Sequence, residues 1–161
     1  MNFHTIKPCT YSYLRCTSKI SNGFESIALL KDPLSAVVYA GHPFTEKSPV
    51  TIAEFEGESF IMLQSGCEVF IEDECRKAGL SLSISYNSKE NETVLSMVKG
   101  KLGISIMLNL LVSKRESHVH LLPLHPPVVR HLGLIVKSSD KIMPLAKEFV
   151  KIAKEHFSNN N

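Results

Sequence analysis

The stretch from Phe60 to Met107, FIMLQSGCEVFIEDECRKAGLSLSISYNSKENETVLSMVKGKLGISIM, decides the fold of this chain. Its pattern of apolar residues, turn residues and helix caps predicts strand, helix, strand, helix, strand. The expected elements are a strand at 60–63, a helix at 67–78, a strand at 80–86, a helix from Ser88 or Asn91 to Gly100, and a strand at 102–107. Two crossovers of this length predict parallel strands joined in the right-handed sense, and so an α/β layer.

The first helix opens with a capping signal. Ser65-Gly66-Cys67-Glu68 has the S-x-x-E spacing in which the Ser and Glu side chains satisfy free backbone donors. A helix N-terminus that follows a parallel strand suits a small anion, and a glycine lets the backbone approach a ligand closely. We therefore select Ser65, Gly66 and Cys67 as candidate effector contacts. The alternative is an ordinary helix cap covered by water.

A second candidate segment is Gly103 to Met107. It is expected at the carboxyl end of a parallel strand, where ligands of such sheets collect. Within it, Ser105 and Met107 are candidate effector contacts. The alternative is that this strand only fills the core.

The four cysteines, Cys9, Cys16, Cys67 and Cys75, form no C-x-x-C pair. Cys67 and Cys75 are eight positions apart on one expected helix, about 12 Å at 1.5 Å per residue, which is too far for a disulfide. We expect reduced thiols. Because a helix N-terminus lowers a thiol pKa, Cys67 also permits a redox sensor, although a small residue packed beside the cap is favoured.

Other chemistry is not indicated. The sequence has no nucleotide-binding glycine motif and no nucleophile elbow, so we expect neither catalytic residues nor a cofactor. The net charge is +2 and the basic residues are scattered, which does not indicate a nucleic-acid surface. Four histidines lack a carboxylate or cysteine at ligand spacing, so we expect a solvated face and no metal at His118, His120, His125 and His131.

The sequence predicts a cytoplasmic protein that does not enter the membrane. No apolar stretch approaches the roughly 18 residues of a membrane span, and residues 1–7 lack the apolar core of a signal peptide.

The remaining segments alternate strands, turns and helices. Thr51-x-x-Glu54 is a second capping box, and Lys31-Asp32-Pro33 predicts a turn between two strands. Leu145, Phe149 and Ile152 are expected to form the apolar stripe of a last helix that has Pro144 in its first turn, with Lys147, Lys151, Lys154 and Glu155 facing water. The expected strands are 13–16, 24–30, 34–40, 119–124 and 130–137.

These residues together resemble a known family. Leu30-Lys31-Asp32-Pro33-Leu34 with His42-Pro43-Phe44, and Val98 to Ile106 with its Gly-Lys-Leu-Gly-Ile core, resemble stretches of LysR-type transcriptional regulators. Ile52 to Phe55 with Phe60-Ile61, and Arg130 to Val136 with Pro144 and Phe149, resemble others in the same order. The resemblance covers about Gly23 to Phe157 and identifies the effector-binding domain of that family.

The resemblance implies an α/β fold of the periplasmic-binding-protein-like type II, with two lobes and an incomplete first lobe. The implied domains are a remnant of the first lobe with a crossing strand at 1–44, a second effector-binding lobe at 45–125, a return strand and C-terminal helix at 126–157, and a disordered tail at 158–161. The crossings are expected near His42-Pro43 and near Pro126 to Arg130.

The implied function is effector sensing for transcription, without catalysis. The implied partners are a small organic or inorganic anion and further copies of the chain, with DNA bound only through a winged helix-turn-helix absent from this chain. Two alternatives stay open. One is a stand-alone solute-binding or redox-sensing module, and the other is a non-functional fragment of a disrupted regulator gene.

Overall fold

The computed structural model describes residues 12–15, 24–66, 68–112, 118–137 and 144–158. The chain divides into two compact units, of which unit 1 holds residues 1–31 and 130–161 and unit 2 holds residues 32–129. The second lobe expected at 45–125 falls inside unit 2. The chain passes from one unit to the other twice, at Lys31–Asp32 and at Val129–Arg130.

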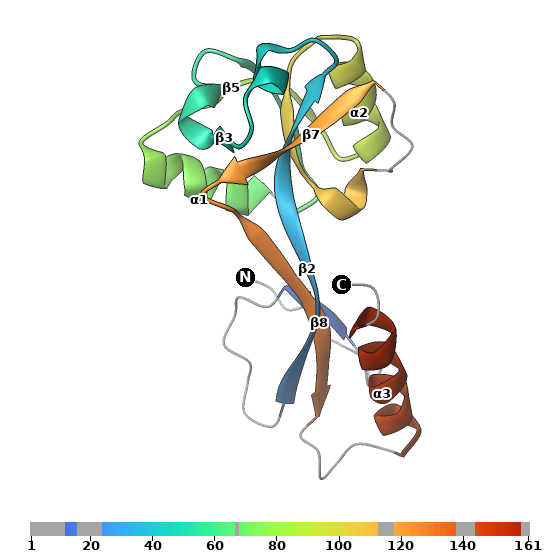
Figure 1. Cartoon of the computed structure of the whole chain (residues 1–161). Coiled ribbons are helices and arrows are strands. Elements are labelled where there is room, and N and C mark those ends of the chain that lie inside the picture. Colours follow the sequence, from blue (N-terminus) through green and yellow to red (C-terminus); the bar gives the residue numbers. More distant parts are fainter. Residues whose placement is uncertain (1–11, 16–23, 67, 113–117, 138–143, 159–161) are drawn as a thin grey trace. The chain divides into compact units, whose positions relative to one another are not determined.

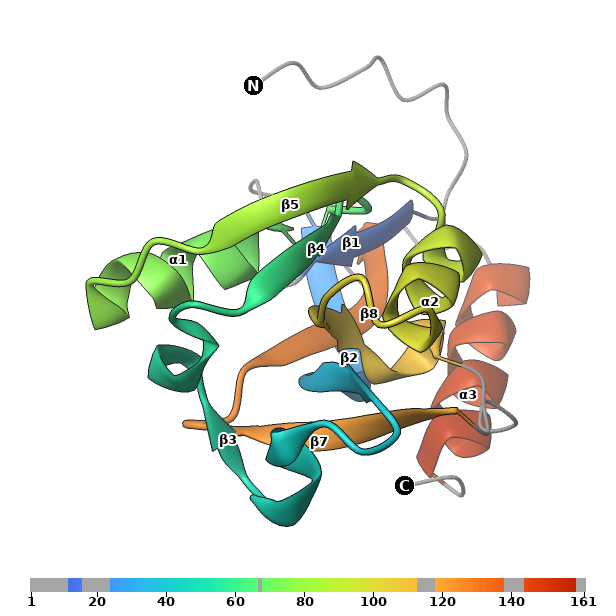
Figure 2. The same cartoon turned by 90° about the horizontal axis from the view of Figure 1, so that it is seen from above.

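Unit 2 contains the predicted parallel layer. Strand β4 (Ser59–Leu63) pairs in parallel with β5 (Ser83–Ser88) on one side. On its other side β4 meets the chain just before β6 (Ser105–Leu108) through a parallel bridge between Phe60 and Ile104. Helices α1 (Glu68–Ala78) and α2 (Asn91–Lys99) make the two connections. Figure 2 shows β4 and β5 side by side, with α1 and α2 on opposite sides of the pair. The predicted strand-helix order is confirmed.

The two helices bury the faces that their periodicity requires. Val94, Leu95 and Val98 of α2 are buried, as predicted. In α1, Ile71 and Cys75 are buried, but Ala78, which we expected on the same stripe, is exposed. Ala78 is the last residue of α1, and the chain leaves the helix axis there. Gly79 follows with φ +67°, the left-handed conformation of a helix C-terminal cap.

A second set of strands completes unit 2. Strand β7 (Val119–His125) pairs antiparallel with the end of β2 (Phe24–Tyr39) and parallel with β3 (Val50–Thr51). Strand β6 also pairs antiparallel with β2. Among the described residues, three single-turn 3-10 helices connect the strands of unit 2, namely η1 (Pro43–Glu46), η2 (Ile52–Phe55) and η3 (Asn109–Leu111).

The predicted turn at Lys31-Asp32-Pro33 is wrong. Residues Phe24 to Tyr39 form one continuous strand, β2 (Figure 1). Proline and the residue before it both favour extended backbone, so Pro33 is compatible with a strand where its missing N–H is not needed. The pairing of β2 with β6 starts at Leu34, directly after the proline. The carboxylate of Asp32, buried at 1% exposure, accepts a hydrogen bond from the Leu110 backbone N–H at 3.1 Å.

Aromatic rings form a continuous chain through the core of unit 2. Edge-to-face contacts join Tyr39 to His42 at 5.0 Å, His42 to Phe44 at 4.6 Å, Phe44 to Phe55 at 5.6 Å and Phe55 to Phe60 at 6.0 Å between ring centroids. Such pairs add about 0.5–1.5 kcal/mol each beyond their buried area. The chain of rings ties the end of β2, η1 and η2 to β4.

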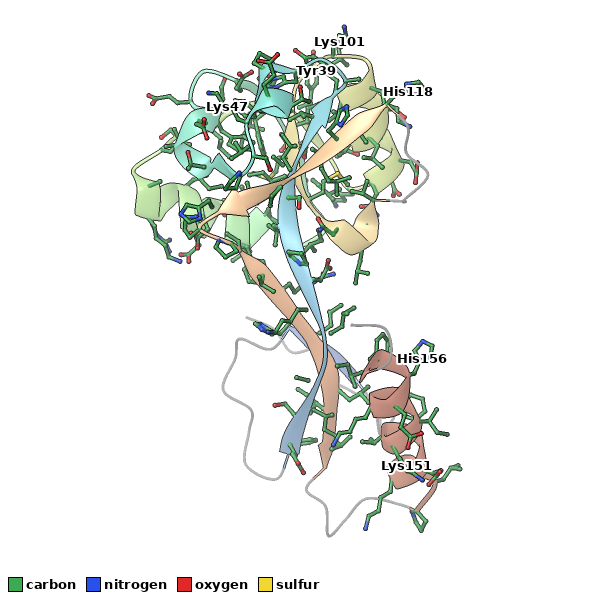
Figure 3. All side chains as sticks on the ribbon, viewed as in Figure 1. Tyr39, Lys47, Lys101, His118, Lys151 and His156 are labelled. Atoms are coloured by element: carbon green, nitrogen blue, oxygen red, sulfur yellow. The ribbon has the colours of Figure 1, made fainter. Side chains whose placement is uncertain are left out.

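Two lysines lie over this aromatic chain at the surface. The Nζ atom of Lys101 is 5.5 Å from the ring centroid of Tyr39, and that of Lys47 is 6.0 Å from the ring centroid of Phe44 (Figure 3). Both distances permit a cation–π attraction, which at exposed sites is worth about 0.5–1 kcal/mol. Lys101 stands two residues after the end of α2 at Lys99 and has φ +59°, so the chain reverses at this residue.

Unit 1 packs one helix on a three-stranded sheet in the part that the structure describes. The strand order is β1 (Ser12–Arg15), β8 (Val129–Lys137), β2. The strand predicted at 130–137 is thereby confirmed, and the one predicted at 13–16 is confirmed over residues 13–15, since residue 16 lies outside the described residues. Helix α3 (Pro144–Ser158) lies beside β8 (Figure 1). Its Val150 and Ala153 pack against a small core of Ile27, Leu134 and Val136.

The predicted apolar stripe of α3 is not the face that the helix buries. Leu145, Phe149 and Ile152 are 80%, 47% and 56% exposed, whereas Ala146 is buried and Val150 is half-buried. The helix has apolar residues on two adjacent faces, and the sheet of unit 1 covers the face with the smaller side chains. Apolar periodicity located an amphipathic helix but did not show which part of its apolar arc meets the sheet.

We predict that Gly103→Ala lowers the free energy of unfolding by about 1–3 kcal/mol. A Cβ at Gly103 would lie 2.4 Å from the backbone oxygen of Ser59, so the start of β6 would have to move away from β4. Urea denaturation measures the change. The matched control is Gly100→Ala, whose Cβ would have no neighbour nearer than 3.4 Å. Equal stability of the two variants would contradict the argument.

We predict that Glu54 stabilises the fold less as the pH falls. Its carboxylate accepts hydrogen bonds from the Thr51 backbone N–H at 2.8 Å and from Lys47 at 3.1 Å, and these hold the pKa of Glu54 below its ordinary value. A lowered folded-state pKa gives stability above the unfolded pKa that is lost as the pH falls through the folded one. The stability difference between wild type and Glu54→Gln should therefore shrink below about pH 4. Urea titrations at several pH values test this, with the surface variant Glu25→Gln as a control for net charge.

Candidate functional site

The strand order β5-β4-β6 creates the candidate site in unit 2. The chain leaves β4 toward β5 on one side, and after β5 it returns past β4 to β6 on the other side. This is a topological switch point, and open α/β sheets bind ligands there, beyond the carboxyl ends of the two diverging strands. The segments at that edge are Gln64–Gly66 after β4 and Asn109–Leu110 after β6. We call these segments the switch edge.

On the β4 side, the switch edge carries two of the predicted residues. Ser65 is exposed and Gly66 is half-buried with φ +91°, a left-handed conformation that favours glycine. The Glu68 carboxylate accepts a hydrogen bond from the Gly66 N–H at 2.5 Å. The glutamate of the predicted capping box therefore reaches back to the Gly66 N–H. Cys67 lies outside the described residues.

On the β6 side, the predicted side chains lie inside the core. Ser105 and Met107 are both fully buried. The Ser105 hydroxyl donates a hydrogen bond to the Ile61 carbonyl oxygen at 2.7 Å, so it joins β6 to β4. The structure thus places Ser65 and Gly66 at the switch edge and does not bring the side chains of Ser105 and Met107 to it.

The sequence reasoning missed Asn109. It directly follows Leu108, the last residue of β6, and its Oδ1 atom is buried with no hydrogen-bond partner among the described residues. An unpaired buried acceptor costs about 1–3 kcal/mol. Its neighbour Leu110 donates its backbone N–H to Asp32. The sequence did carry a signal for Asn109. The apolar run GISIML ends at Leu108, one residue beyond the candidate segment that we selected, so the first polar residue after the strand is Asn109.

Acidic side chains in the N-terminal half of α1 make the β4 side of the switch edge acidic. Glu68 is followed by Glu72, Asp73 and Glu74, and Arg76 and Lys77 stand in the last turn. A hydrogen bond donated by Lys77 lowers the pKa of Asp73, and the hydrogen bonds that Lys77 donates to Glu74 and Asp73 raise the pKa of Lys77. These ion pairs are exposed and contribute little to stability. They arrange the helix with its basic residues at the C-terminal end, as the helix dipole favours.

The Cys75 thiol is unsuited to be a reactive nucleophile in this conformation. The side chain is 5% exposed, and burial, followed by the charges of Glu74 and Glu72, raises the pKa of Cys75. The thiolate is the reactive form, so a raised pKa reduces reactivity.

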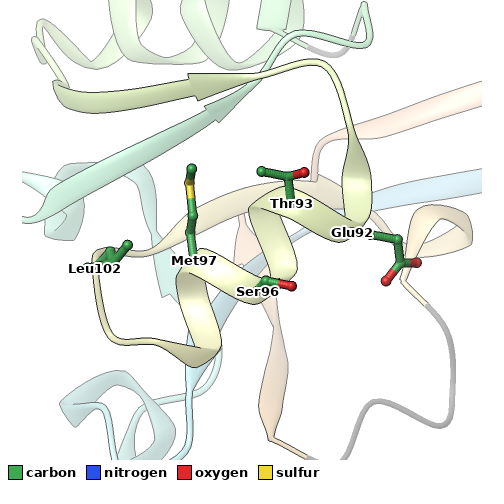
Figure 4. A pocket seen from close by; sticks show the side chains of 5 residues that line it. All are labelled: Glu92, Thr93, Ser96, Met97 and Leu102. Carbon is green, nitrogen blue, oxygen red and sulfur yellow. The ribbon is translucent and has the colours of Figure 1, made fainter.

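Two surface hollows in unit 2 lie away from the switch edge. One, of about 420 Å³, is lined by the outer face of α2 and by Leu102 (Figure 4). The other, of about 430 Å³, lies between α1 and the approach to β5 and includes Cys75 and Arg76. Neither is lined by Ser65, Gly66, Ser105 or Met107.

Among the residues that the structure describes, no group of three or more His, Cys, Asp or Glu side chains could hold a metal ion. The four histidines discussed above are all exposed, at positions 118, 120, 125 and 131. In the same part of the chain, no helix is long and apolar enough to cross a bilayer.

Comparison with known proteins identifies the family. Residues 13–158 match the family model described as LysR substrate binding domain. This chain belongs to the LysR family. Its match to the substrate-binding domain covers both units and confirms the resemblance derived from the residues.

Two curated relatives illustrate the extent of the match. The LysR domain is 31% identical over 135 residues to the uncharacterized HTH-type transcriptional regulator YvbU of Bacillus subtilis, covering 83% of this chain and 46% of the relative. It is 27% identical over 143 residues to the hydrogen peroxide-inducible genes activator of Escherichia coli O157:H7, covering 84% of this chain and 45% of the relative. The chain therefore spans about half the length of these relatives.

A solved structure shares the fold. The regulatory domain of Synechocystis PCC6803 CcmR, determined in complex with 2-PG, superposes with a TM-score of 0.78 at 16% sequence identity. The superposition covers 94% of this chain and 75% of that chain. The LysR domain thus has the α/β, periplasmic-binding-protein-like type II fold that the resemblance implied.

Proposed function

We propose that this chain is the effector-sensing domain of a LysR-type transcriptional regulator and that its effector is a small organic or inorganic anion bound at the switch edge. The observation that carries the proposal is the strand order β5-β4-β6, which brings the N-terminus of α1 and the end of β6 to one edge of the layer. The family match supports the sensing role. The proposal includes no catalytic step and no cofactor.

Each candidate residue has a distinct role in this proposal. The exposed Ser65 hydroxyl donates to the anion, and the Gly66 backbone amide faces it at the positive end of the helix dipole. Ser105 and Met107 contribute through the strand that carries them, because their side chains are buried. Asn109 closes the far side of the switch edge.

Glu68 limits the affinity of the site. Its carboxylate holds the Gly66 N–H, which an anionic effector also needs. The effector must therefore displace this carboxylate and bind beside its negative charge. A neutral side chain at position 68 removes both the competition and the repulsion.

Signal transfer follows from a population shift. An effector that binds one arrangement of the domain better than another changes their populations by its difference in affinity. In the cytoplasm, this change would pass to a further copy of the chain and to DNA through a winged helix-turn-helix outside residues 13–158.

We predict that one or more small anions raise the melting temperature of the purified chain in a dose-dependent way. At 100 times the Kd the added stability is about 2.7 kcal/mol. The panel contains phosphate, sulfate, simple carboxylates and 2-PG, the compound named with the CcmR structure. Ser65→Ala should weaken binding about 2- to 12-fold, the loss of one hydrogen bond worth about 0.5–1.5 kcal/mol. Glu68→Gln should tighten it.

The control is Ser96→Ala, which removes an exposed hydroxyl from α2. Unchanged affinity in Ser65→Ala would contradict the site, and a cooperative melt that no anion shifts would contradict the ligand class. A broad or absent transition would favour the non-functional fragment.

A second candidate function is redox sensing. The observation that favours it is the 27% identity to proteins named hydrogen peroxide-inducible genes activator. In this candidate the Cys67 thiolate attacks hydrogen peroxide, the O–O bond breaks, hydroxide leaves, and the sulfur becomes a sulfenic acid. Cys75 is the less reactive thiol, since burial raises its pKa.

We predict for this candidate that hydrogen peroxide oxidises Cys67 before Cys75. Dimedone labelling followed by peptide mass spectrometry measures the rate at each thiol, with Cys67→Ser and Cys75→Ser as matched variants. Labelling of Cys75 at an equal or greater rate, or labelling no faster than that of a free cysteine, would exclude redox sensing by Cys67.

A further inference from the structure

The side-chain oxygen of Asn109 is a buried acceptor that the fold leaves unused. Among the described residues, its Oδ1 atom is shielded from water and accepts no hydrogen bond. Nearly all buried polar atoms in native proteins are paired, so an unpaired one calls for an explanation. A molecule that binds beside Asn109 and brings a donor explains it, because the missing hydrogen bond then forms on binding.

The parallel register of β4 and β6 places Asn109 at the switch edge, across from Ser65. Phe60 of β4 bridges Ile104 just before β6. Five positions farther along each segment come Ser65 and Asn109. Neighbouring strands of a sheet lie about 4.8 Å apart. The two residues therefore stand on the two sides of the switch edge, and one small molecule can span them.

Asn109 lies close enough to the surface for a ligand to reach it. The residue as a whole is half-buried, and Leu110, which follows it, is 57% exposed. The terminal torsion of an asparagine side chain is broad, so the amide can turn about the Cβ–Cγ bond while the backbone stays in place. The backbone itself is held, because the Leu110 N–H donates to the buried Asp32 carboxylate at 3.1 Å. A ligand can thus meet this acceptor without a change of fold.

The two sides of the switch edge suit different groups of one ligand. On the β4 side, the Gly66 N–H and the N-terminus of α1 suit an acid group. On the β6 side, an amide oxygen accepts and cannot donate, so it suits a hydroxyl or an amino group. Because the two segments are neighbours in one layer, the donor of the ligand has to lie near its acid group.

We propose that the effector is a small organic acid with a hydroxyl or amino group one or two carbons from its acid group, and that the Asn109 Oδ1 atom accepts the hydrogen bond of that group. This inference rests on the proposed function, since it adds a second contact at the same site. It makes Asn109 a specificity-determining residue. An analogue without the donor leaves the buried oxygen unpaired, and sites built around a hydrogen bond discriminate strongly against such analogues.

The experiment compares matched acids by isothermal titration calorimetry on the full 161-residue chain. Acetate, glycolate and glycine share one skeleton and carry hydrogen, hydroxyl or ammonium next to the carboxylate. Succinate, malate and aspartate repeat this series with four carbons. In at least one series, the hydroxy or the amino acid should bind at least about fivefold more tightly than the unsubstituted acid, the effect of pairing one buried acceptor. The comparison of hydroxyl with ammonium identifies the donor.

Two variants of one residue test the role of Asn109. Asn109→Leu keeps the size of the side chain without an acceptor, so it should lose the preference and bind each acid as weakly as wild type binds the unsubstituted one. Asn109→Asp keeps an acceptor and should retain the preference for the amino acid. The control, Ser96→Ala on the exposed face of α2, should keep every wild-type ratio. A merely structural role of Asn109 would not change these ratios.

Circular dichroism and melting of each ligand-free variant check the fold. If Asn109→Leu does not fold, the ratios in wild type and in Asn109→Asp decide. Equal affinity within both series, or an Asn109→Leu variant that keeps the preference, would overturn the inference. Binding of phosphate or sulfate but of none of the six acids would also overturn it, while the proposed anion site would stand. A cooperative melt that no anion shifts would overturn both.

Discussion

Two backbone hydrogen bonds between β4 and the start of β6 are the interaction on which unit 2 depends. The Ile61 N–H donates to the Ile104 oxygen at 2.8 Å, and the Ile104 N–H donates to the Ser59 oxygen at 2.9 Å. They form only because Gly103 has no Cβ, which would lie 2.4 Å from the Ser59 oxygen. The parallel alignment that they fix brings the ends of β4 and β6 to one edge, and the candidate site exists because those ends meet.

The same alignment explains why the site has few free groups. The Ser105 hydroxyl donates its hydrogen bond to the Ile61 carbonyl oxygen, and the Glu68 carboxylate accepts the hydrogen bond of the Gly66 amide. At this edge Ser65 is exposed, and the side-chain oxygen of Asn109 has no hydrogen-bond partner among the described residues. A ligand at this edge has to exchange with protein groups already in place, which suits a sensor that responds to effector concentration rather than a site that is permanently filled.

Strand β2 and helix α3 show how tertiary contacts override local signals. Lys31-Asp32-Pro33 has the composition of a turn, but the buried Asp32 carboxylate is satisfied by Leu110, which is 78 positions away in the sequence. The strand therefore continues through the proline. In α3, the face that carries Ala146 is buried, whereas Leu145 is exposed. Neither partner is adjacent in sequence, so neither outcome could be found from local composition.

The sequence by itself determined the order of elements from Phe60 to Leu108, the inward faces of α1 and α2 apart from Ala78, and the family. These depend on periodicity, caps and glycine positions, which act over a few residues. Only the tertiary structure decided that Ser105 and Met107 are buried, that Asn109 stands at the switch edge, and that α3 keeps an outer apolar stripe. Those facts depend on which distant segment covers each side chain. An amphipathic pattern shows that one face of an element will be buried, but it does not show which other element buries it.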